Sequence, residues 1–343
     1  MTVHASPVRR VGMIGAGWVA GYHLPAWGRQ RHRAEIVAIA DPTRQAAERR
    51  AAEFGIPHVY AGAEEMLEAG RLDAVDICSP RETHAAMVRL AAGRRLDILC
   101  QKPLGIDFAE AEAVVARVAP PARLMVHENW RFRAWYRLLK RWLEEGAAGD
   151  IRQASLEFLS SGMIAGPDTL RPALVRQPFF RTQPRLLVME VLIHHLDTLR
   201  YLLGELDVIA ARLERSNDEI VAEDVAAVVL RRPEDGLVVT VTGNLAVHGA
   251  PPMPRDHLRL FGTRGTIELL GSTLGLRGAG MREEAFDPEA TYQGSYDAAI
   301  EHFLDGLDTG AAFETKPEDN LRTLRLVEEI YRLSQFDPAA KPR

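Results

Sequence analysis

The stretch that decides the fold is VGMIGAGWVA, residues 11–20, followed at residues 35–42 by EIVAIADP. In the first stretch, a short apolar run meets Gly15 and Gly17 and then passes into a helical pattern, with Ala20 at the third small position. This order predicts a buried strand, a tight turn and the start of a helix. Glycines in such a turn let main-chain N–H groups approach a diphosphate, which is stabilised at the positive end of the helix dipole.

The spacing of the small residues fits the dinucleotide fingerprint Gly-x-Gly-x-x-Gly/Ala, which by itself is a weak signal. The alternative is a glycine turn that binds no ligand. The second stretch favours the ligand, because a strand predicted over residues 36–40 ends in Asp41. A carboxylate there accepts hydrogen bonds from the ribose hydroxyls of adenosine and repels a 2′-phosphate, so we expect NAD in preference to NADP. Arg44 is expected to lie over the adenine or to tolerate a phosphate. Cofactor contacts are assigned to Gly15, Gly17, Trp18, Val19, Asp41 and Arg44.

Length, charge and cysteine content narrow the class of protein. The 343 residues predict about two domains, and 47% hydrophobic residues are enough for a sizeable core. A net charge of -5, without a dense basic block, argues against nucleic acid as a partner. No apolar run reaches the roughly 18 residues that a membrane span needs. Cys78 and Cys100 each end a buried-looking strand, where cysteine acts as a small apolar residue, so neither a disulfide nor a metal site is expected.

Arg9 and Arg10 precede an apolar stretch and have the form of a twin-arginine export signal. That stretch is the predicted nucleotide-binding strand itself, and removing it would destroy the site. We therefore expect the protein in the cytoplasm.

Residues 1–126 are predicted to form a Rossmann domain that binds NAD. Strands alternate with helices, which implies parallel pairing and a doubly wound α/β sheet with helices on both faces. After the first strand, further strands are predicted over residues 36–40, 74–78, 97–100 and 124–126, and helices over residues 44–54, after Glu82, and over residues 108–118.

Residues 127–343 are predicted to form an α+β domain with a mainly antiparallel sheet, for substrate binding and oligomerisation. An exposed sheet face commonly pairs with its copy, so a homodimer or homotetramer is expected. Residues 161–184 contain four prolines and are predicted to be a long loop. Strands are predicted over residues 151–160, 208–214, 224–231, 237–245, 257–261 and 266–270, and helices over residues 135–145, 186–203, 296–308 with Ser295 as the cap, and 318–334.

Lys102 follows the fifth predicted strand, in the run Gln101-Lys102-Pro103. Ligands of doubly wound folds bind beyond the carboxyl ends of the strands, so this lysine is expected to reach the nicotinamide end of the cofactor. Its ammonium, held near a substrate oxygen, would favour removal of a hydroxyl proton. The alternative is a lysine that is simply solvated.

The predicted helix over residues 186–203 is apolar on most of its surface and should be largely buried. Glu190, His194 and Asp197 form one polar stripe on it, with spacings of four and three residues. A histidine in such a stripe suits general acid and base catalysis. Two alternatives stay open: a core histidine bonded to a carboxylate, and a metal site at Glu190 and His194, which lacks a clear third ligand. His195 points elsewhere and is expected to be structural.

Residues after the last Rossmann strand, Glu128 to Arg131, should line the cleft between the domains. Asn129 and Arg131 are assigned to the substrate, although Arg131 also suits a structural role. Tyr292 and Tyr296 are expected to close the substrate side.

These elements together resemble the glucose-fructose oxidoreductase, inositol dehydrogenase and MocA family over nearly the whole chain. Members show the glycine fingerprint, a Glu-Lys-Pro element and an Asp-x-Gly-x-His-x-x-Asp helix, which here read GAG at residues 15–17, QKP at residues 101–103 and EVLIHHLD at residues 190–197. The resemblance implies that Lys102 and His194 are the catalytic pair. It places Glu190 where the family often has an aspartate that binds a substrate hydroxyl.

The resemblance also implies further cofactor contacts. The turn at Ser79 and Pro80 and the nearby His84 would lie against the ribose and nicotinamide, although His84 equally suits a helix-start cap. Gln101 and Lys102 complete the expected cofactor contacts.

Two departures from the family pattern concern substrate identity more than reaction type. Gln101 replaces the usual glutamate and removes a negative charge near Lys102, and Leu192 replaces a glycine and narrows the pocket. The run Cys100 to Pro103, together with His127-Glu128-Asn129, resembles a branch of the family that includes D-apiose dehydrogenase-like enzymes.

We therefore expect an NAD-dependent dehydrogenase that acts on a sugar, polyol or related secondary alcohol, in which His194, assisted by Lys102, accepts the hydroxyl proton. Two other hypotheses stay open. One is a redox-neutral glycosidase or lyase that retains its NAD, and the other is a non-catalytic NAD-binding regulatory protein.

Overall fold

A computed structural model describes residues 7–167, 169–278 and 280–339. The chain divides into two compact units. The first comprises Met1–Phe132 and Tyr292–Leu324, and the second comprises Arg133–Thr291 and Arg325–Arg343. Each unit therefore combines a long segment with a shorter one from nearer the C-terminus.

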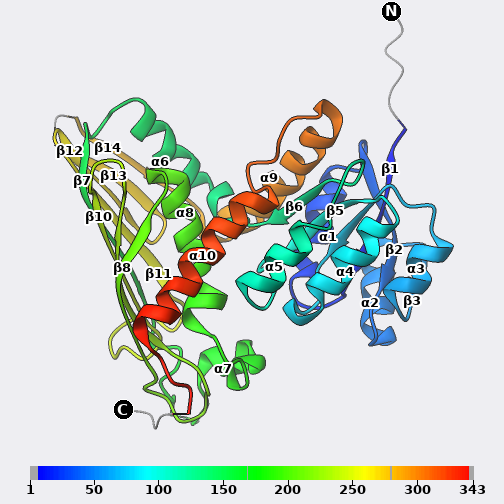
Figure 1. The fold of residues 1–343 in the computed structure, drawn as a ribbon, viewed down its shortest axis with the longest axis horizontal. Helices are drawn as coiled ribbons and strands as arrows, with labels where there is room; N and C mark the ends of the chain where they lie inside the picture. Colours follow the sequence, from blue (N-terminus) through cyan, green and yellow to red (C-terminus); the bar gives the residue numbers. More distant parts are fainter. Residues whose placement is uncertain (1–6, 168, 279, 340–343) are drawn as a thin grey trace, which may run out of the picture. The chain divides into compact units, whose positions relative to one another are not determined.

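The first unit contains a six-stranded parallel sheet in the order β3-β2-β1-β4-β5-β6, with helices between successive strands (Figure 1). This order confirms the predicted doubly wound Rossmann fold. The strands are β1 (Arg9–Ile14), β2 (Ala34–Ala40), β3 (His58–Tyr60), β4 (Ala74–Ile77), β5 (Asp97–Gln101) and β6 (Leu124–His127), and the helices are α1 (Ala20–Arg29), α2 (Arg44–Phe54), α3 (Ala63–Ala69), α4 (Arg81–Gly93) and α5 (Phe108–Val115). Strand β3 and helix α3 were not predicted, because these elements are short and β3 lies at the edge of the sheet with partly exposed side chains.

Helix α9 (Pro288–Thr309) also belongs to the first unit. Its buried residues Ile300 and Phe303 join the core cluster that contains Trp27 of α1. The predicted start of this helix at a Ser295 cap is wrong. Ser295 lies inside α9, is fully buried, and its hydroxyl donates to the carbonyl of Tyr292 at 2.7 Å. A serine that bonds back to its own helix does not end it.

The second unit contains an eight-stranded sheet in the order β14-β13-β12-β11-β7-β10-β9-β8. All neighbours are antiparallel except β7 and β10, which pair in parallel, so the predicted mainly antiparallel sheet is confirmed. The strands are β7 (Ile151–Leu159), β8 (Asp207–Glu214), β9 (Val225–Arg231), β10 (Val238–Asn244), β11 (Arg255–Gly262), β12 (Gly265–Leu270), β13 (Thr273–Gly278) and β14 (Arg282–Ala285). Strands β13 and β14 were not predicted: β13 contains two glycines, and all four residues of β14 are exposed.

The predicted single helix over residues 186–203 is two elements. A π-helical segment, η3 (Leu187–Leu192), precedes the α-helix α8 (Ile193–Leu203). Widened π turns are rare and occur frequently at functional sites. Nearly all side chains of α8 are buried, as expected.

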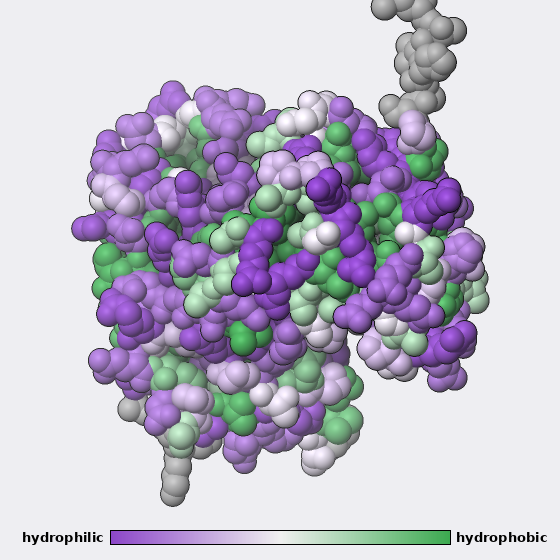
Figure 2. Space-filling model, turned by 45° about the vertical axis from the view of Figure 1, so that its right-hand side comes forward, coloured by the Kyte–Doolittle hydropathy of each residue, from purple (hydrophilic) through white to green (hydrophobic). Residues whose placement is uncertain are grey.

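The remaining helices complete the two units. Helix α6 (Ala134–Glu144) lies in the second unit, and α10 (Pro317–Ser334) begins in the first unit and ends in the second. The long segment predicted as a loop contains a short α-helix, α7 (Pro172–Arg176), and a 3-10 turn, η2 (Pro178–Arg181). No helix among the described residues has the length and hydropathy to cross a bilayer. Figure 2 shows one face on which hydrophobic side chains are interspersed among hydrophilic ones.

Candidate active site

The two glycines of the turn after β1 have different surroundings. Gly15 lies close to the backbone of another segment, whereas the space beside Gly17 is open. Gly15 has a φ of 103°, and a Cβ there would lie 2.7 Å from backbone atoms of Cys78 and Ser79. Among the described residues, no heavy atom lies within 4 Å of a Cβ built on Gly17. The first glycine is thus required by the fold, whereas the second leaves space beside the N-terminus of α1, where a diphosphate would fit.

Asp41, directly after β2, faces this turn. Its Oδ2 accepts the N–H of Ala16 at 2.8 Å and its Oδ1 accepts the N–H of Thr43 at 2.7 Å. Two backbone donors therefore fix the carboxylate beside the glycine turn. Its remaining lone pairs suit it for accepting ribose hydroxyls.

The other residues expected to contact the cofactor in this region differ in their solvent exposure. Trp18 is 57% exposed and its ring packs edge-on against Tyr22, and Val19 is half-buried. Arg44 forms an ion pair with Glu48 at 2.8 Å on the exposed face of α2. Arg50 was not predicted at this turn, but its Nη2 donates to the Gly17 carbonyl at 3.4 Å.

The turn after β4 is tied to the turn after β5 by His84. This side chain is buried, with Nδ1 2.7 Å from the Pro103 carbonyl and Nε2 2.8 Å from the Ser79 carbonyl. The reading of His84 as a helix cap is wrong, because α4 begins at Arg81 after Pro80 and His84 lies within it. Ser79 Oγ bonds to Thr83 Oγ1 at 2.6 Å.

Lys102 is half-buried and directly follows β5. The side chain of its neighbour Gln101 points into the core. There the amide nitrogen lies 2.7 Å from His23 Nε2 and 3.0 Å from His127 Nδ1. Gln101, the residue directly before Lys102, is therefore held by side chains of α1 and β6.

A buried carboxylate continues this cluster. Asp76 Oδ2 accepts from His23 Nδ1 and from Trp27 Nε1, both at 2.7 Å. Burial, and then the proximity of Asp76, raise the pKa of the Cys78 thiol well above its usual value. Among the described residues, His23, Asp76 and Cys78 have the spacing of metal ligands. In this structure His23 Nδ1 and Asp76 Oδ2 bond to each other, and the Cys78 thiol lies 3.5 Å from Asp76 Oδ1.

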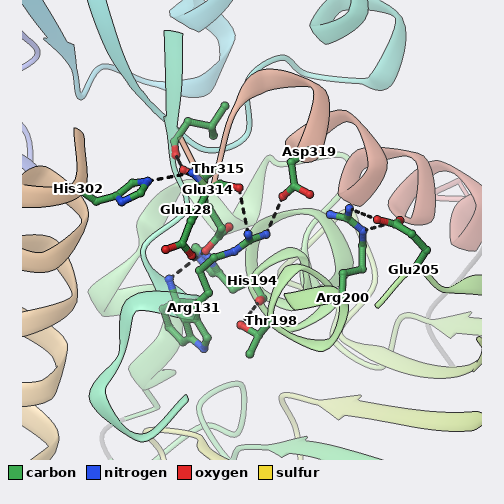
Figure 3. Close-up of polar contacts among 12 residues, drawn as sticks. Glu128, Arg131, His194, Thr198, Arg200, Glu205, His302, Glu314, Thr315 and Asp319 are labelled. Carbon is green, nitrogen blue, oxygen red and sulfur yellow. Dashed lines mark hydrogen bonds and ion pairs between the residues drawn. The ribbon is translucent and has the colours of Figure 1, made fainter. Parts of the chain in front are cut away.

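The residues after β6 bond within the first unit. Asn129 Nδ2 donates to Ser295 Oγ at 2.7 Å. Arg131 donates to Asp319 Oδ2 at 2.7 Å and to the Glu314 carbonyl at 3.2 Å (Figure 3). The backbone N–H of Trp130 donates to Glu128 Oε1 at 3.2 Å. The contacts of Arg131 favour the structural one of its two expected roles.

The two expected tyrosines lie on α9, one turn apart. The hydroxyls of Tyr292 and Tyr296 are 3.0 Å apart, and both rings pack against Tyr22 of α1. Tyr296 is buried and its ring also lies 5.2 Å from that of His127. This aromatic group therefore covers the buried histidines.

In the second unit, the expected polar residues lie on η3 and α8. Glu190 is half-buried on η3, and His194 and Asp197 are buried on α8. The Thr198 hydroxyl donates to the His194 carbonyl at 2.8 Å (Figure 3).

The free N–H groups at the start of this helix are capped by Glu223, which is itself bonded to Tyr331. Neither residue was expected from the sequence. Glu223 Oε1 accepts from the Leu186 and Val188 amides at 3.2 and 2.9 Å, and from the Tyr331 hydroxyl at 2.5 Å. Burial raises the pKa of the Glu223 carboxyl, and these donors partly offset the rise. Capping by a side chain from another element fixes where the π turn begins.

His195 is structural, as its buried contacts indicate. Its Nε2 lies 2.8 Å from Asp256 Oδ1, and Tyr136 donates to Asp256 Oδ2 at 2.7 Å. Burial alone would raise the pKa of the Asp256 carboxyl, but His195, Arg133 and Tyr136 hold it well below its usual value. This carboxylate therefore connects α6, α8 and β11.

We predict that Asp256→Asn lowers the free energy of unfolding at pH 7 by about 3 kcal/mol, because it removes one partner of a buried ion pair. The folded pKa of Asp256 is depressed, so its contribution is present above the unfolded pKa and is lost as pH falls through the folded pKa. Urea unfolding at pH 7 and pH 3 checks this, and the difference between the two proteins should shrink at pH 3. An equal difference at both pH values would contradict it.

Two family models match the chain. A model of an oxidoreductase family with an NAD-binding Rossmann fold matches residues 9–127, and a model of the GFO/IDH/MocA C-terminal domain matches residues 136–268. D-apiose dehydrogenase from Rhizobium rhizogenes is 30% identical over 333 residues, with 93% of each chain covered. The chain belongs to the Gfo/Idh/MocA family of oxidoreductases. The expected family membership and the expected NAD-dependent oxidoreductase activity are thereby confirmed.

Two further proteins resemble the chain over nearly its full length. Inositol 2-dehydrogenase from Rhizobium meliloti is 24% identical, covering 94% of this chain and 96% of the relative. The crystal structure of an oxidoreductase from Agrobacterium radiobacter, in complex with NAD⁺, L-tartaric acid and magnesium, superposes with a TM-score of 0.87 at 30% identity. The alignment covers 95% of this chain and 96% of that one.

Several residues in this Gfo/Idh/MocA member escaped sequence reasoning although the sequence carried a signal. Asp76 and His127 are polar residues in otherwise apolar strands, and His23 stands in an apolar stretch of α1. A polar side chain at a core-facing position has to find a partner there. The pattern therefore signals a buried polar group, but it does not say which residue is the partner.

Proposed function

We propose that the protein oxidises a secondary alcohol group of a sugar or polyol, with NAD as the hydride acceptor, and catalyses the reverse reduction with the same groups. The observation that carries this proposal is the glycine turn with Asp41 fixed beside it, in a chain of the Gfo/Idh/MocA family. The relatives support the substrate class, since their names include D-apiose dehydrogenase and inositol 2-dehydrogenase.

Bound NAD supplies the electron-pair acceptor, and the chain supplies binding, orientation and proton transfer. We assign the diphosphate to the turn at Gly15, Gly17, Trp18 and Val19, and the adenosine ribose to Asp41, with Arg44 near the adenine. The turns at Ser79, Pro80, His84, Gln101 and Lys102 are assigned to the nicotinamide end. The open space beside Gly17 supports the diphosphate assignment.

In the proposed reaction, His194 accepts the proton of the substrate hydroxyl and returns it in the reverse direction. The Lys102 ammonium stabilises the negative charge that develops on the same oxygen. Glu190 binds a neighbouring substrate hydroxyl, and Asn129 is assigned to the substrate as well. Arg131 takes the structural role, through its bonds to Asp319 and the Glu314 carbonyl. A histidine suits the proton transfer because its ordinary pKa lies near neutral pH.

The two regions of the chain take different parts in this proposal. Residues 1–126 bind NAD, and residues 127–343 bind the substrate and form a homodimer or homotetramer through the eight-stranded sheet. Exposed apolar residues on strands of this sheet, Ile209, Val238 and Leu270, support an interface there. We place the protein in the cytoplasm, because Arg9 and Arg10 belong to the central strand β1.

The test is the formation of NADH, followed by absorbance, with NAD or NADP and a panel of aldoses, branched pentoses, polyols and inositols. We expect turnover with NAD to exceed turnover with NADP, because the Asp41 carboxylate repels a 2′-phosphate. Glycoside cleavage without net NADH release would instead establish the redox-neutral alternative. Tight NAD binding without reduction by any panel member would favour the regulatory alternative.

A further inference from the structure

The amide group of Gln101 lies between two buried imidazoles. Its nitrogen is 2.7 Å from His23 Nε2 and 3.0 Å from His127 Nδ1, and the two rings have their centroids 4.2 Å apart. His23 and His127 are fully buried and Gln101 is 8% exposed. The contact therefore joins the ends of β5 and β6 to α1, away from solvent.

The chemistry of the donors fixes the protons of this cluster. An amide nitrogen carries two hydrogens and donates only, so both imidazole nitrogens that face it have to present lone pairs. The proton of His23 then lies on Nδ1, where it donates to Asp76 Oδ2 at 2.7 Å. By the same assignment, the proton of His127 is placed on Nε2. Trp27 Nε1, which also only donates, lies 2.7 Å from the same Asp76 oxygen. The Asp76 carboxylate therefore accepts from both side chains.

We propose that Gln101 is a positioning residue for Lys102 and that it acts through its neutral, doubly donating amide. The inference rests on the proposed function, in which Lys102 acts on the substrate oxygen. Gln101 is the last residue of β5, and Lys102 is the next residue of the chain. A side chain held at both amide hydrogens fixes the backbone from which Lys102 projects.

The segment is held on the other side of Lys102 as well. His84 Nδ1 lies 2.7 Å from the carbonyl oxygen of Pro103. Lys102 is thus flanked by one residue clamped through its side chain and one clamped through its backbone. Because a misplacement of about 1 Å in an active site can cost on the order of 10²-fold in rate, such clamps on both neighbours have a direct catalytic consequence.

The neutral charge of the Gln101 amide distinguishes a positioning role from ordinary packing. A carboxylate in place of the amide has nearly the same shape, but it only accepts hydrogen bonds. His23 and His127 would then have to turn protons toward it, and His23 would have to become doubly protonated to keep its bond to Asp76. The cluster would rearrange at the residue before Lys102 without any change in side-chain volume.

The experiment compares the wild-type chain with Gln101→Glu, Gln101→Met and the control Gln335→Glu, which makes the same change of charge at an exposed position after α10. Ring-nitrogen NMR of ¹⁵N-histidine-labelled protein reports the tautomers. The sequence has only four lysines, Lys102, Lys140, Lys316 and Lys341, so ¹³C-dimethylation gives an assignable signal for each. Steady-state kinetics with the substrate found in the panel completes the comparison.

We expect His23 as the Nδ1–H tautomer and His127 as the Nε2–H tautomer in the wild type. Both Gln101 variants should shift the Lys102 signal but not those of Lys140 and Lys316. Both should lower kcat on the order of 10²-fold, with the KM for NAD within about threefold. Gln335→Glu should match the wild type. Gln101→Glu should change the tautomers of His23 and His127, because a carboxylate only accepts hydrogen bonds. Gln101→Met should only remove the hydrogen bonds from position 101 to the two rings.

Two results would overturn the proposal. One is the opposite pair of tautomers in the wild type, and the other is an unchanged Lys102 signal in the folded Gln101 variants. If the wild type turns over none of the panel substrates, the proposed function fails. In that case the tautomers and the Lys102 signal still decide whether Gln101 positions Lys102.

Discussion

Replacement of Lys102 by methionine is expected to lower the rate of NADH formation by about 10²- to 10⁴-fold, and His194→Gln by a similar factor. Methionine keeps a long, unbranched side chain but lacks the ammonium that stabilises the developing alkoxide in the proposed reaction. Glutamine keeps hydrogen-bonding groups at position 194 but has no group that titrates near neutral pH. Both variants should unfold at temperatures close to that of the wild type.

Matched controls make this result specific. Lys140→Met removes a lysine of α6 that lies 3.9 Å from Glu144 and over the Tyr201 ring. His257→Gln removes a partly exposed histidine of β11, which bonds to Glu268 at 2.8 Å. Both controls should retain kcat within about twofold, since exposed ion pairs contribute little. The assignment of Lys102 and His194 fails if either variant at those positions keeps kcat within about threefold of the wild type.

The second large effect is expected at the two glycines of the turn. Alanine at position 15 should destabilise the fold, whereas alanine at position 17 should weaken NAD binding. Gly15→Ala places a methyl group 2.7 Å from backbone atoms of Cys78 and Ser79, at a φ of 103° that only glycine adopts readily. We expect it to lower the free energy of unfolding by more than about 2 kcal/mol. Gly17→Ala meets no described heavy atom within 4 Å, so its unfolding should match that of the wild type.

Gly17→Ala should nevertheless weaken NAD binding by at least about tenfold, because its methyl group occupies the space assigned to the diphosphate. Thermal unfolding and NAD titration by fluorescence separate the two effects. A stable Gly17→Ala protein that binds NAD as tightly as the wild type would place the diphosphate elsewhere. Gly28→Ala is the matched control, since a Cβ there also meets no described heavy atom within 4 Å and Gly28 lies near the end of α1.

The first unit could be predicted from the sequence because its determinants are local. The run from Val11 to Ala20 specifies a strand, a turn and a helix through hydrophobicity and residue size alone. Parallel pairing then follows from the alternation of strands and helices. The strand order observed in the structure confirms that inference. The short edge strand β3 escaped because three half-exposed residues carry no periodic signal.

The start of the helix that carries Glu190 and His194 could not be predicted in the same way. Its apolar pattern fits a single α-helix, and the spacing of Glu190, His194 and Asp197 was interpreted on that basis. The structure begins it with the π-helical segment η3, whose free amides are capped by Glu223, and Glu223 in turn accepts from the Tyr331 hydroxyl. Both residues come from positions far along the chain, so no local pattern contains them.

The sequence by itself determined the fold class, the cofactor and the family, because each depends on residue types at short spacings along one strand, turn or helix. Only the tertiary structure decided how the polar groups pair. It showed that Gln101 faces His23 and His127, that His84 joins two turns rather than capping a helix, and that Ser295 lies inside α9. The physical reason is that a buried polar side chain must be satisfied by whichever partner the fold brings to it, and that partner is set by packing between distant segments.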